Sequence, residues 1–461
     1  MNPWAARNLV YPFQERIVGR PTFSYLKELE QSQWLSRSAL ETLQAQKLNE
    51  LLLTALDHSP WHANRIRAAG LEQQVREGRV GLGDLPRVPV MNKRDAWENL
   101  DRIVWKGVPG GAFKYTTGGS SGEPLIFYFG RRRQASDAAG RMRARRWWGV
   151  EVGDREVYLW GAPVELNKTD RIKTLRDRLI NQLVLNAFEM SSERMDEYLH
   201  AISAWQPKCI YGYASSIALL AAHGEARGIR LQLPELKVVC TTGEPLYPHQ
   251  RELIRRFFNA PVANEFGSRD IGFTAHETPG GQMLLMSESH ILEALDSSGK
   301  SVALGEMGEA VITGFTSEAQ PFIRYRTGDM VRVSAQAESA GRGLHVIQEV
   351  IGRETDFVVR EDGTIMHALA VIYVLRAVEG VAQFKCIQHS TLHMEVQIVP
   401  GPTWSDLAAQ AAVKGLKARL GQDLQVTLTM MHDILPEASG KYRYVISHVG
   451  MERELQQAVA R

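Results

Sequence analysis

The sequence predicts an α/β protein, with a large N-terminal domain of open α/β sheets plus a β-subdomain, followed by a small α+β C-terminal domain. Three observations predict this. The chain of 461 residues is too long for one ordinary hydrophobic core. Strand-like and helical stretches alternate between residues 157 and 258, as in a parallel sheet. Short β-like segments then occupy residues 284–333, and a polar break follows at 351–356.

Composition indicates a globular protein and gives no reason to expect nucleic acid or a membrane as a partner. The 54 basic and 52 acidic residues leave a formal net charge of +2. The N-terminus lacks an uninterrupted apolar segment, and the apolar stretch 368–375 is less than half a membrane span. We therefore expect a cytoplasmic protein. Cys209, Cys240 and Cys386 are far apart in the sequence, which predicts buried core residues rather than disulfides or a cysteine-rich zinc site.

The first part of the chain reads as a helical entry segment. Between about residues 22 and 69, leucines recur at spacings of three and four, and His58-Ser59-Pro60 interrupts the pattern. Residues 85–90 contain two prolines and predict an extended link. Asn92 is then expected to cap a short helix that runs through Leu100.

The stretch from Tyr115 to Pro124 packs four Ser/Thr hydroxyls and three glycines into ten residues. Glycines allow positive φ angles, and successive N–H groups in such a turn form a concave site for phosphate oxygens. A Walker loop is excluded, because Glu123-Pro124 follows the last glycine and a strand-like stretch comes next instead of a helix. The glycine spacing is also wrong for a dinucleotide fingerprint. An anion-binding loop between two strands remains, with an ordinary polar hairpin loop as the alternative.

Seven arginines and two tryptophans crowd the stretch between Gly130 and Trp148. Because the chain as a whole is not basic, a nucleic-acid patch is disfavoured. We expect a solvated helix face whose arginines pair with acidic neighbours. A supporting role near a phosphate-bearing ligand is the second interpretation.

Strand-like stretches in the middle of the chain end in polar turns, and helical stretches follow. In an open α/β sheet, ligands bind where the parallel strands end, so these turns are the candidate site. Residues 170–188 are predicted to form a helix after a strand at 157–160. The turns and their flanks are strand 208–211, turn 212–216 and helix 217–223; strand 236–240, turn 241–245 and helix 249–258; and strand 263–266 with loop 267–272.

The last hundred or so residues predict strands and one helix, which Ser405 can cap and which runs to Leu420. Residues 336–343 read as a surface loop. A late glycine turn at 437–443 carries Lys441, which by itself would be read as a solvated loop residue.

Six stretches, taken together and in order, resemble the motifs of the adenylate-forming superfamily of acyl-CoA synthetases, adenylation domains and luciferases. Within it they resemble the phenylacetate-CoA ligase-like branch that includes capsule-biosynthesis ligases. The resemblance covers nearly the whole chain. The six stretches are Thr117–Pro124, Thr242-Gly243-Glu244-Pro245, Phe266–Asp270, Tyr325–Asp329, Gly352-Arg353 and Ser439–Arg443.

The resemblance implies a large domain of residues 1–350, a hinge at 351–356 and a small mobile C-terminal domain at 357–461. It implies that ATP and Mg²⁺ activate a carboxylic acid through an acyl-adenylate with release of pyrophosphate. Transfer to CoA, giving an acyl- or aryl-CoA thioester, is the leading second step. Direct transfer to an amine or hydroxyl, for instance on a sugar, and a nucleotide-binding regulatory protein without turnover are the alternatives. A homodimer is the oligomeric state that we consider for this protein.

The resemblance also implies roles for individual residues. Lys441, Ser120 and Ser121 would act on the phosphates, and Asp270 would hold Mg²⁺. Asp329, assisted by Arg353, would accept the ribose hydroxyls. The nucleotide site would further include Thr117, Gly118, Gly119, Gly122, Gly243, Glu244, Pro245, Phe266 and Gly267. By the strand-end argument, the carboxylate pocket would include Tyr211, Gly212, Ser215 and Thr241, and its aromatic content indicates an aryl or acyl acid.

Three departures from the family pattern bear on activity. Glu123 stands where the phosphate loop usually has lysine. Asp270 stands in place of a Mg²⁺-linked glutamate, and Arg269 in place of threonine. Residues 360–373 fit poorly to the pattern that borders the CoA channel. A weakened or repurposed enzyme, and an acceptor other than CoA, therefore stay open.

Overall fold

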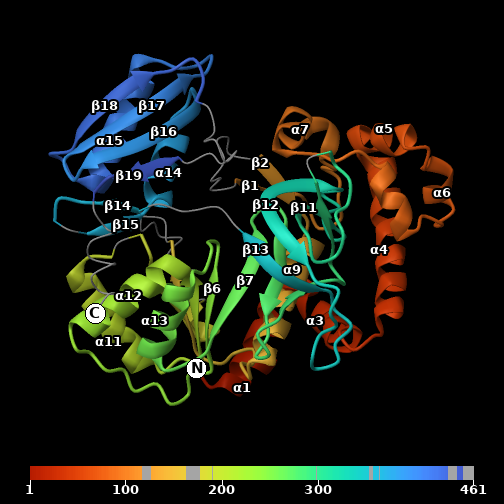
Figure 1. Ribbon diagram of the computed structural model, residues 1–461, viewed down its shortest axis with the longest axis horizontal. Helices are drawn as coiled ribbons and strands as arrows, with labels where there is room; N and C mark the ends of the chain where they lie inside the picture. The colour runs from red at the N-terminus through yellow and green to blue at the C-terminus, as the bar shows by residue number, and fades with distance from the viewer. Residues whose placement is uncertain are drawn as a thin grey trace.

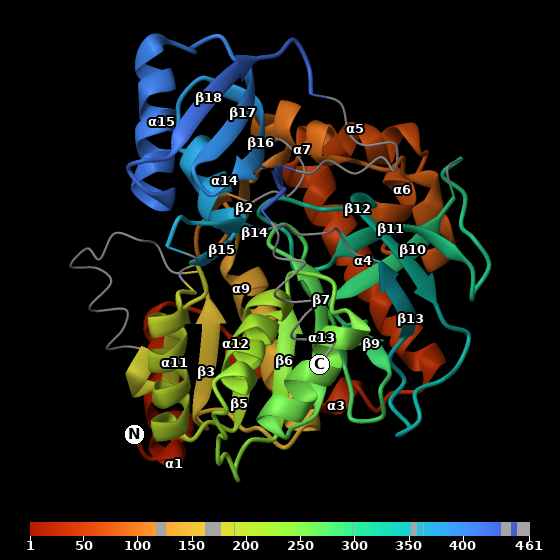
Figure 2. The same ribbon diagram turned by 60° about the vertical axis from the view of Figure 1, so that its left-hand side comes forward.

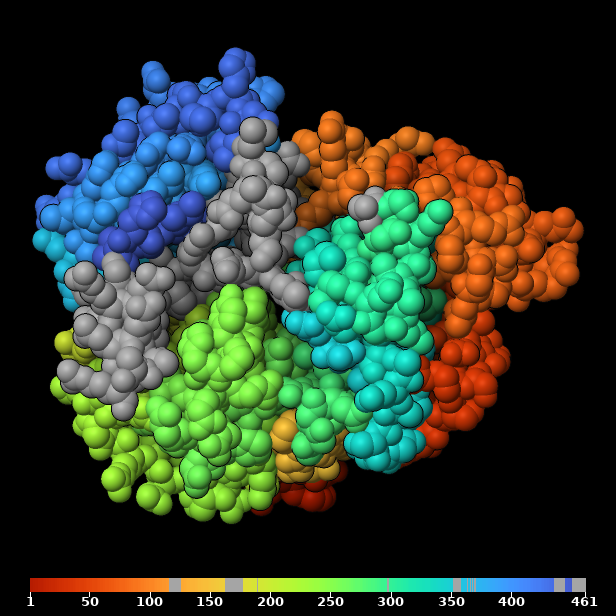
Figure 3. All heavy atoms as spheres, in the orientation of Figure 1, coloured from red at the N-terminus to blue at the C-terminus, as the bar shows by residue number. Residues whose placement is uncertain are grey.

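The computed structural model describes the chain except residues 117–125, 162–176, 189, 297, 352–356, 363, 435–443 and 450–461. It contains a large mixed sheet, a helical N-terminal part and a separate α+β region at the C-terminus (Figure 1). The fold class predicted from the sequence is confirmed. Figure 3 shows the same three parts as neighbouring regions of one surface.

Two predicted boundaries of the N-terminal helices, the break near Ser59 and the cap at Asn92, are present in the structure. The helical segment breaks at Ser59, between α4 (Arg37–His58) and α5 (Pro60–Ala68). Asn92 caps α7 (Lys93–Glu98) and shares a capping box with Asp95. The link at 85–90 is only partly extended, because residues 82–87 form the 3₁₀ helix η2 (Leu82–Arg87). The other helices here are α1 (Pro3–Ala5), η1 (Ala6–Val10), α2 (Tyr11–Ile17), α3 (Thr22–Ser32), α6 (Glu72–Arg76) and α8 (Leu100–Ile103).

Eleven strands form the large sheet, in the order β10-β11-β12-β13-β9-β8-β7-β6-β5-β3-β4. Strand β7 (Val262–Ser268) pairs in parallel with β6 and antiparallel with β8. It therefore joins a parallel half to an antiparallel half. The parallel half contains β3 (Glu156–Trp160), β4 (Gln182–Asn186), β5 (Cys209–Tyr213) and β6 (Val238–Thr242). The antiparallel half contains β8 (Gly272–Glu277), β9 (Met283–Leu285), β10 (His290–Leu295), β11 (Met307–Gly314), β12 (Tyr325–Val333) and β13 (Val346–Ile351).

Helices cover both faces of the parallel half. One face packs on α11 (Ser192–Trp205), α12 (Ala214–Ala226) and α13 (Pro248–Phe258) (Figure 1). The opposite face meets α9 (Arg131–Trp147), which contacts Tyr158 and Tyr211 through Arg145. Before α9, the antiparallel pair β1 (Phe113–Thr116) and β2 (Ile126–Phe129) flanks the predicted anion loop, as expected for a loop between two strands.

The prediction of a solvated arginine face on α9 is wrong, although the predicted acidic partners are present. Arg133, Arg143 and Arg145 are buried. Arg143 pairs with Glu288, which is also buried, and Arg145 pairs with Glu156. Charged groups leave water only when they are paired and hydrogen-bonded, so these arginines pack the helix against the sheet instead of facing solvent.

The prediction of a helix over 170–188 is correct for residues 177–179, which are helical, but wrong for the strand that follows. Residues 182–186 form β4, an edge strand that pairs in parallel with β3. Asn181 precedes the strand with a φ of 61°, and its side chain binds the carbonyl oxygens of Gly153 and Met1. This left-handed, anchored residue breaks the helical continuity that the spacing of apolar residues suggested.

The C-terminal region is built on a four-stranded sheet in the order β18-β17-β16-β19. Ser405 caps α15 (Asp406–Leu420), as predicted. All three cysteines are buried and free, which confirms their predicted core role. The remaining elements are β14 (Phe357–Val359), β15 (Ile365–His367), α14 (Leu369–Arg376), β16 (Val381–Ser390), β17 (His393–Pro400), β18 (Gln425–Met430) and β19 (Val445–Ser447).

We predict that Arg143→Met destabilises the protein by about 3–5 kcal/mol, because it leaves the Glu288 carboxylate buried without its ionic partner. The double variant Arg143→Met, Glu288→Leu should lose less, since both charges are removed. Urea denaturation followed by circular dichroism measures both. Arg132→Met, on an exposed residue of the same helix, is the control. A double variant less stable than the single one would contradict this account.

Candidate active site

A cluster of hydroxyls and charges lies on the sheet face that meets α9. Tyr211 and Thr242 both donate their hydroxyls to Oε1 of Glu265, each at 3.0 Å. The strand register explains this meeting, because residues opposite each other in neighbouring strands point to the same face. Tyr213 lies opposite Thr242, and Cys240 lies opposite both Tyr211 and Ala263, so Tyr211, Thr242 and Glu265 share one face.

Arg141 of α9 completes this cluster. Its Nε lies 3.6 Å from Oε1 of Glu265, and its guanidinium lies over the ring of Phe273, 5.3 Å from the centroid. Burial lowers the pKa of Arg141, but the neighbouring Tyr211 and Glu265 outweigh burial and hold the pKa above its usual value. Arg141 therefore stays cationic. Burial, reinforced by the charge of Glu265, raises the pKa of Tyr211, so its hydroxyl keeps its proton.

Glu244 connects the turn after β6 to the first turn of α12. Its Oε2 accepts the backbone N–H of Ser215 at 3.0 Å, where the helix N-terminus favours a negative charge. Gly243, just before it, has a φ of +77°, which a residue with a side chain rarely adopts. The Ser215 hydroxyl is buried and has no hydrogen-bond partner among the described residues. Pro245 follows, half-buried.

Asp270 occupies a buried position in the loop between β7 and β8. Its oxygens accept hydroxyl hydrogen bonds from Ser268 and, at 2.7 Å, from Tyr325 of β12. Burial raises the pKa of Asp270, but the charge of Lys93 and these two hydroxyls lower it further, so the net shift is downward. Arg133 adds a hydrogen bond to the backbone oxygen of Asp270 at 3.2 Å. The loop thus presents an ionised carboxylate.

Two residues of β7 shape the approach to this loop. Phe266 is half-buried and packs against the core beside Ile271 and Leu292. Gly267 follows a shift in the β7–β8 register, and a Cβ added there would lie 2.3 Å from the carbonyl oxygen of Gly272. Only glycine allows this close approach.

Asp329 lies in an irregularity of β12. The register with β11 shifts here, because Glu309 lies opposite Met330 whereas Val311 lies opposite Arg326, so β12 has more residues than β11 in this stretch. Gly328 has a φ of +79°, and the Asp329 N–H donates to the Thr327 hydroxyl at 3.1 Å. Bulges of this kind redirect side chains next to functional sites. Asp329 is half-buried.

An aromatic corner joins the carboxyl ends of β3 and β5 to the C-terminal region. Trp160 stacks on Tyr213 with centroids 4.4 Å apart, and Phe188 lies 6.1 Å from Tyr373 of α14. The Arg269 guanidinium lies over the Tyr373 ring at 5.9 Å. Figure 2 shows β3 pointing toward the C-terminal region. The loop that carries Asp270 therefore contacts α14.

The structure brings together only part of the predicted pocket. Thr241 faces the opposite side of the sheet from Tyr211, and its hydroxyl donates to the Ala263 carbonyl at 3.3 Å. Gly212 packs closely against the Leu159 carbonyl oxygen. Several predicted residues lie outside the described part of the chain: Thr117, Gly118, Gly119, Ser120, Ser121, Gly122, Glu123, Arg353 and Lys441.

Sequence reasoning missed Arg141, Thr242, Glu265 and Tyr325 as functional candidates. Thr242 and Tyr325 belong to motif stretches that had been recognised, so strand alternation could have selected Thr242. Nothing local marks Arg141 and Glu265, because they meet only when α9 packs on the sheet.

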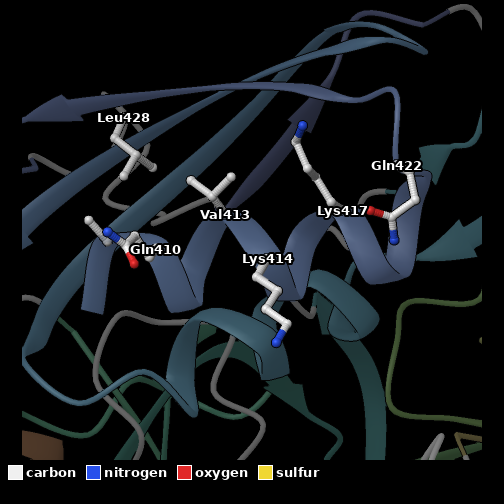
Figure 4. A pocket seen from close by; sticks show the side chains of 7 residues that line it. Gln410, Val413, Lys414, Lys417, Gln422 and Leu428 are labelled. Carbon is white, nitrogen blue, oxygen red and sulfur yellow. The ribbon is translucent and has the colours of Figure 1, made fainter. Parts of the chain in front are cut away.

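A further pocket, shown in Figure 4, is not part of this site. It lies between α15 and β18 in the C-terminal region and shares no lining residue with the strand-end loops. Within the described ranges, no helix combines the length and apolar character needed to cross a membrane.

Known proteins resemble this chain in its C-terminal region and over most of its length. Residues 358–448 match the CapK C-terminal domain. Over 457 residues, covering 97% of this chain and 98% of the relative, the chain is 22% identical to the protein CapK of Staphylococcus aureus. It is 23% identical over 354 residues to phenylacetate-coenzyme A ligase of Thermus thermophilus, covering 73% of this chain and 74% of the relative. The chain is thus similar to CapK over nearly its whole length and to a phenylacetate-CoA ligase over 73% of it.

Solved structures of 2-hydroxyisobutyryl-CoA ligase share the fold of this chain. A crystal structure of 2-hydroxyisobutyryl-CoA ligase, in complex with 2-HIB-AMP and CoA in the thioesterification state, superposes with a TM-score of 0.58 at 19% identity. The superposition covers 94% of each chain. The same ligase in an open conformation gives a TM-score of 0.56 at 18% identity, covering 90% of this chain and 93% of that chain.

We predict that Tyr325→Phe raises the pKa of Asp270, because the variant loses one hydroxyl that stabilises the carboxylate. The folded pKa of Asp270 is depressed, so its contribution to stability is present above the unfolded value of about 3.9 and is lost as pH falls through the folded value. The difference in stability between the wild type and Tyr325→Phe should accordingly be largest at neutral pH and become smaller at acidic pH.

Thermal unfolding of both proteins between neutral pH and pH about 3 measures this difference. Tyr198→Phe is the control, since the Tyr198 hydroxyl donates to the neutral carbonyl of Asn186 at 3.1 Å. Its loss of stability should not depend on pH in this range. A constant difference for Tyr325→Phe across the range would contradict the assignment.

Proposed function

We propose that the protein activates a carboxylic acid with ATP, forming an acyl-adenylate and pyrophosphate, and then transfers the acyl group to an acceptor. One observation carries the proposal. This chain is similar to CapK and the phenylacetate-CoA ligases, and its ionised Asp270 lies in the loop after β7. Tyr325 of the strand that carries Asp329 donates to it.

In the first step, an oxygen of the substrate carboxylate attacks the α-phosphorus of ATP, and the bond from that phosphorus to pyrophosphate breaks. The leaving pyrophosphate develops negative charge. The hydroxyls and backbone N–H groups of the loop with Thr117, Ser120 and Ser121, together with Lys441, would neutralise this charge. Asp329 would accept the ribose hydroxyls with the help of Arg353, and the turn of Gly243 to Pro245 would lie along adenine.

The residues present fit a magnesium ion bound mainly through the nucleotide. No group of three or more His, Cys, Asp or Glu side chains within the described ranges is placed to hold a metal. Mg²⁺ in nucleotide sites commonly takes one or two protein carboxylates and completes its shell with phosphates and water. Asp270 is ionised and can supply one such oxygen. When bound, the ion would neutralise phosphate charge.

CoA is the leading acceptor, and the product would be an acyl- or aryl-CoA thioester. One observation favours an amine or hydroxyl acceptor as a second candidate. Residues 360–373, which fit poorly to the family pattern at the CoA channel, place Tyr373 against Arg269. Mass analysis of products with CoA present separates the two, because an acyl-adenylate that persists beside free CoA favours the amine or hydroxyl.

The test of the proposed function is ATP–pyrophosphate exchange with Mg²⁺ across a panel of carboxylic acids. We expect exchange that depends on the acid. In Lys441→Ala, exchange should fall about a hundredfold to a thousandfold, since a cation aimed at developing phosphate charge contributes that much. Transfer from a supplied acyl-adenylate should stay nearly intact. ATP binding without exchange for every acid would instead indicate the regulatory protein.

We predict that Asp329→Ala weakens ATP binding by about 1–3 kcal/mol for each ribose hydroxyl left without a partner. Isothermal titration of the variant with ATP gives the change. Asp296→Ala is the matched control, because Asp296 is exposed and caps its own turn through Ser298 and Lys300. Equal ATP affinity of Asp329→Ala and the wild type would remove the ribose assignment.

A further inference from the structure

A row of large apolar side chains lies exposed along the N-terminal helices. They are between 57% and 68% exposed, and we call them the N-terminal stripe: Trp4, Leu9, Phe13 and Ile17. The last three are spaced by four residues, so they share one helix face. Between Trp4 and Leu9 the spacing is five, and the π-helical segment η1 has an i→i+5 hydrogen bond from the Tyr11 N–H to the Ala6 carbonyl, so five residues make about one turn here. The stripe is therefore continuous across α1, η1 and α2.

The other side of these helices is held against the rest of the protein. Ala6 is buried, and a Cβ added at Gly153 would lie 2.8 Å from a backbone oxygen of α1. Glu15 is also buried, where it pairs with Arg20 and accepts a hydrogen bond from the Thr22 hydroxyl. A surface helix normally turns its apolar residues toward the core and its charges toward water. Here a charge is inside and large apolar side chains are outside, so the fold presents these side chains to a partner.

The stripe lies at the end of the sheet opposite the candidate active site. The Arg7 guanidinium donates to the Val152 carbonyl at 2.8 Å, shortly before β3 begins. The Asn181 side chain, just before β4, donates to the Met1 carbonyl at 3.1 Å. The N-terminal helices are therefore attached at the amino ends of the parallel strands, whereas the candidate site lies at their carboxyl ends. Figures 1 and 2 both show α1 at the far end of the sheet from the C-terminal region, so a partner bound to the stripe would leave the candidate site open.

The exposed charges of this segment are basic. Residues 1–21 contain three arginines and one glutamate, and that glutamate is the buried Glu15. Arg16 is exposed next to the stripe, and the side chains of Arg7 and Arg20 are 33% and 28% exposed. Glu151, which lies 3.8 Å from Arg7, is also paired with an arginine of α9. Residues 1–21 therefore combine apolar side chains with positive charge and expose no acidic side chain of their own.

Charge complementarity selects the partner. In a symmetric dimer that buries the stripe of both copies, the basic residues of the two copies would come together and repel each other. The surface of an anionic membrane instead attracts basic residues and takes up apolar side chains beneath its headgroups. Helices that lie flat on membranes carry this combination of tryptophan, phenylalanine and leucine with basic residues. The net charge of +2 for the whole chain does not reveal this local separation, so composition alone gave no reason to expect a membrane.

We propose that the helical segment of residues 3–17 lies flat on an anionic lipid surface. The apolar side chains of the stripe insert among the acyl chains, and Arg16 pairs with the negatively charged headgroups. The candidate active site then lies on the side of the protein away from the membrane. Membrane binding of this kind is independent of the adenylation activity proposed above.

The experiment measures sedimentation of the full-length protein with vesicles of phosphatidylcholine, alone or mixed with phosphatidylglycerol. The wild type should bind the anionic vesicles at least about tenfold more tightly than the neutral ones, as expected for two or three arginines near the surface, and added salt should weaken this binding. Phe13→Ser and Ile17→Ser should each weaken binding by about tenfold or more, because each removes an inserted apolar side chain. Arg16→Gln should weaken binding to anionic vesicles about fivefold and leave binding to neutral vesicles unchanged.

Leu407→Ser is the matched control, because Leu407 is 76% exposed on α15 in the C-terminal region, and this variant should bind vesicles like the wild type. All the replaced side chains are exposed, so the thermal unfolding of each variant should match that of the wild type. Wild-type protein that does not sediment with anionic vesicles would overturn the inference, as would Phe13→Ser and Ile17→Ser variants that bind as tightly as the wild type. Sedimentation equilibrium tests the other occupant. A wild-type dimer that Phe13→Ser dissociates, in protein that does not bind vesicles, would assign the stripe to a second copy of the chain and overturn membrane binding.

Discussion

Strand β7 is the constraint on which the rest of the structure depends, because it pairs in parallel on one side and antiparallel on the other. The parallel side needs crossover helices, and these cover the sheet with α11, α12 and α13. The antiparallel side returns directly through the loop of Asp270. Both halves of the sheet therefore meet at the end of one strand. Glu265 and Asp270 lie on either side of that junction.

Buried ion pairs fix the position of α9, the helix that covers the candidate site. Arg143, Arg145 and Arg141 of α9 reach Glu288, Glu156 and Glu265 respectively. Pairs of this kind add little net stability over apolar packing, but a shift of the helix would leave charges unpaired at a high cost. The arginines thus define the position of α9 over the sheet. The contact of Arg141 with Glu265 follows from that position.

Local signals in the sequence predicted local structure well. The caps Asn92 and Ser405 and the break at Ser59 are as expected, because a cap depends on neighbouring residues alone. The spacing of apolar residues predicted a helix where the structure has β4. Asn181, just before this strand, adopts a left-handed conformation and binds the carbonyl of the distant Gly153. In the candidate site, the turn of Glu244 and the loop of Asp270 were found from strand ends and motif order. Arg141 and Glu265 could not be found, since their contact exists only in the packed molecule.

The buried arginines of α9 also bear on the order in which the chain folds. Arg143 and its partner Glu288 are 145 residues apart, and Arg133 and its acceptor at Asp270 are 137 residues apart. The helix alone offers little apolar surface, so it gains its packing only after strands far along the chain have assembled. Contacts of such long sequence separation carry the loop-closure entropy that slows folding. During synthesis, α9 therefore leaves the ribosome well before Glu265 and Glu288, two of the acidic residues that will hold it.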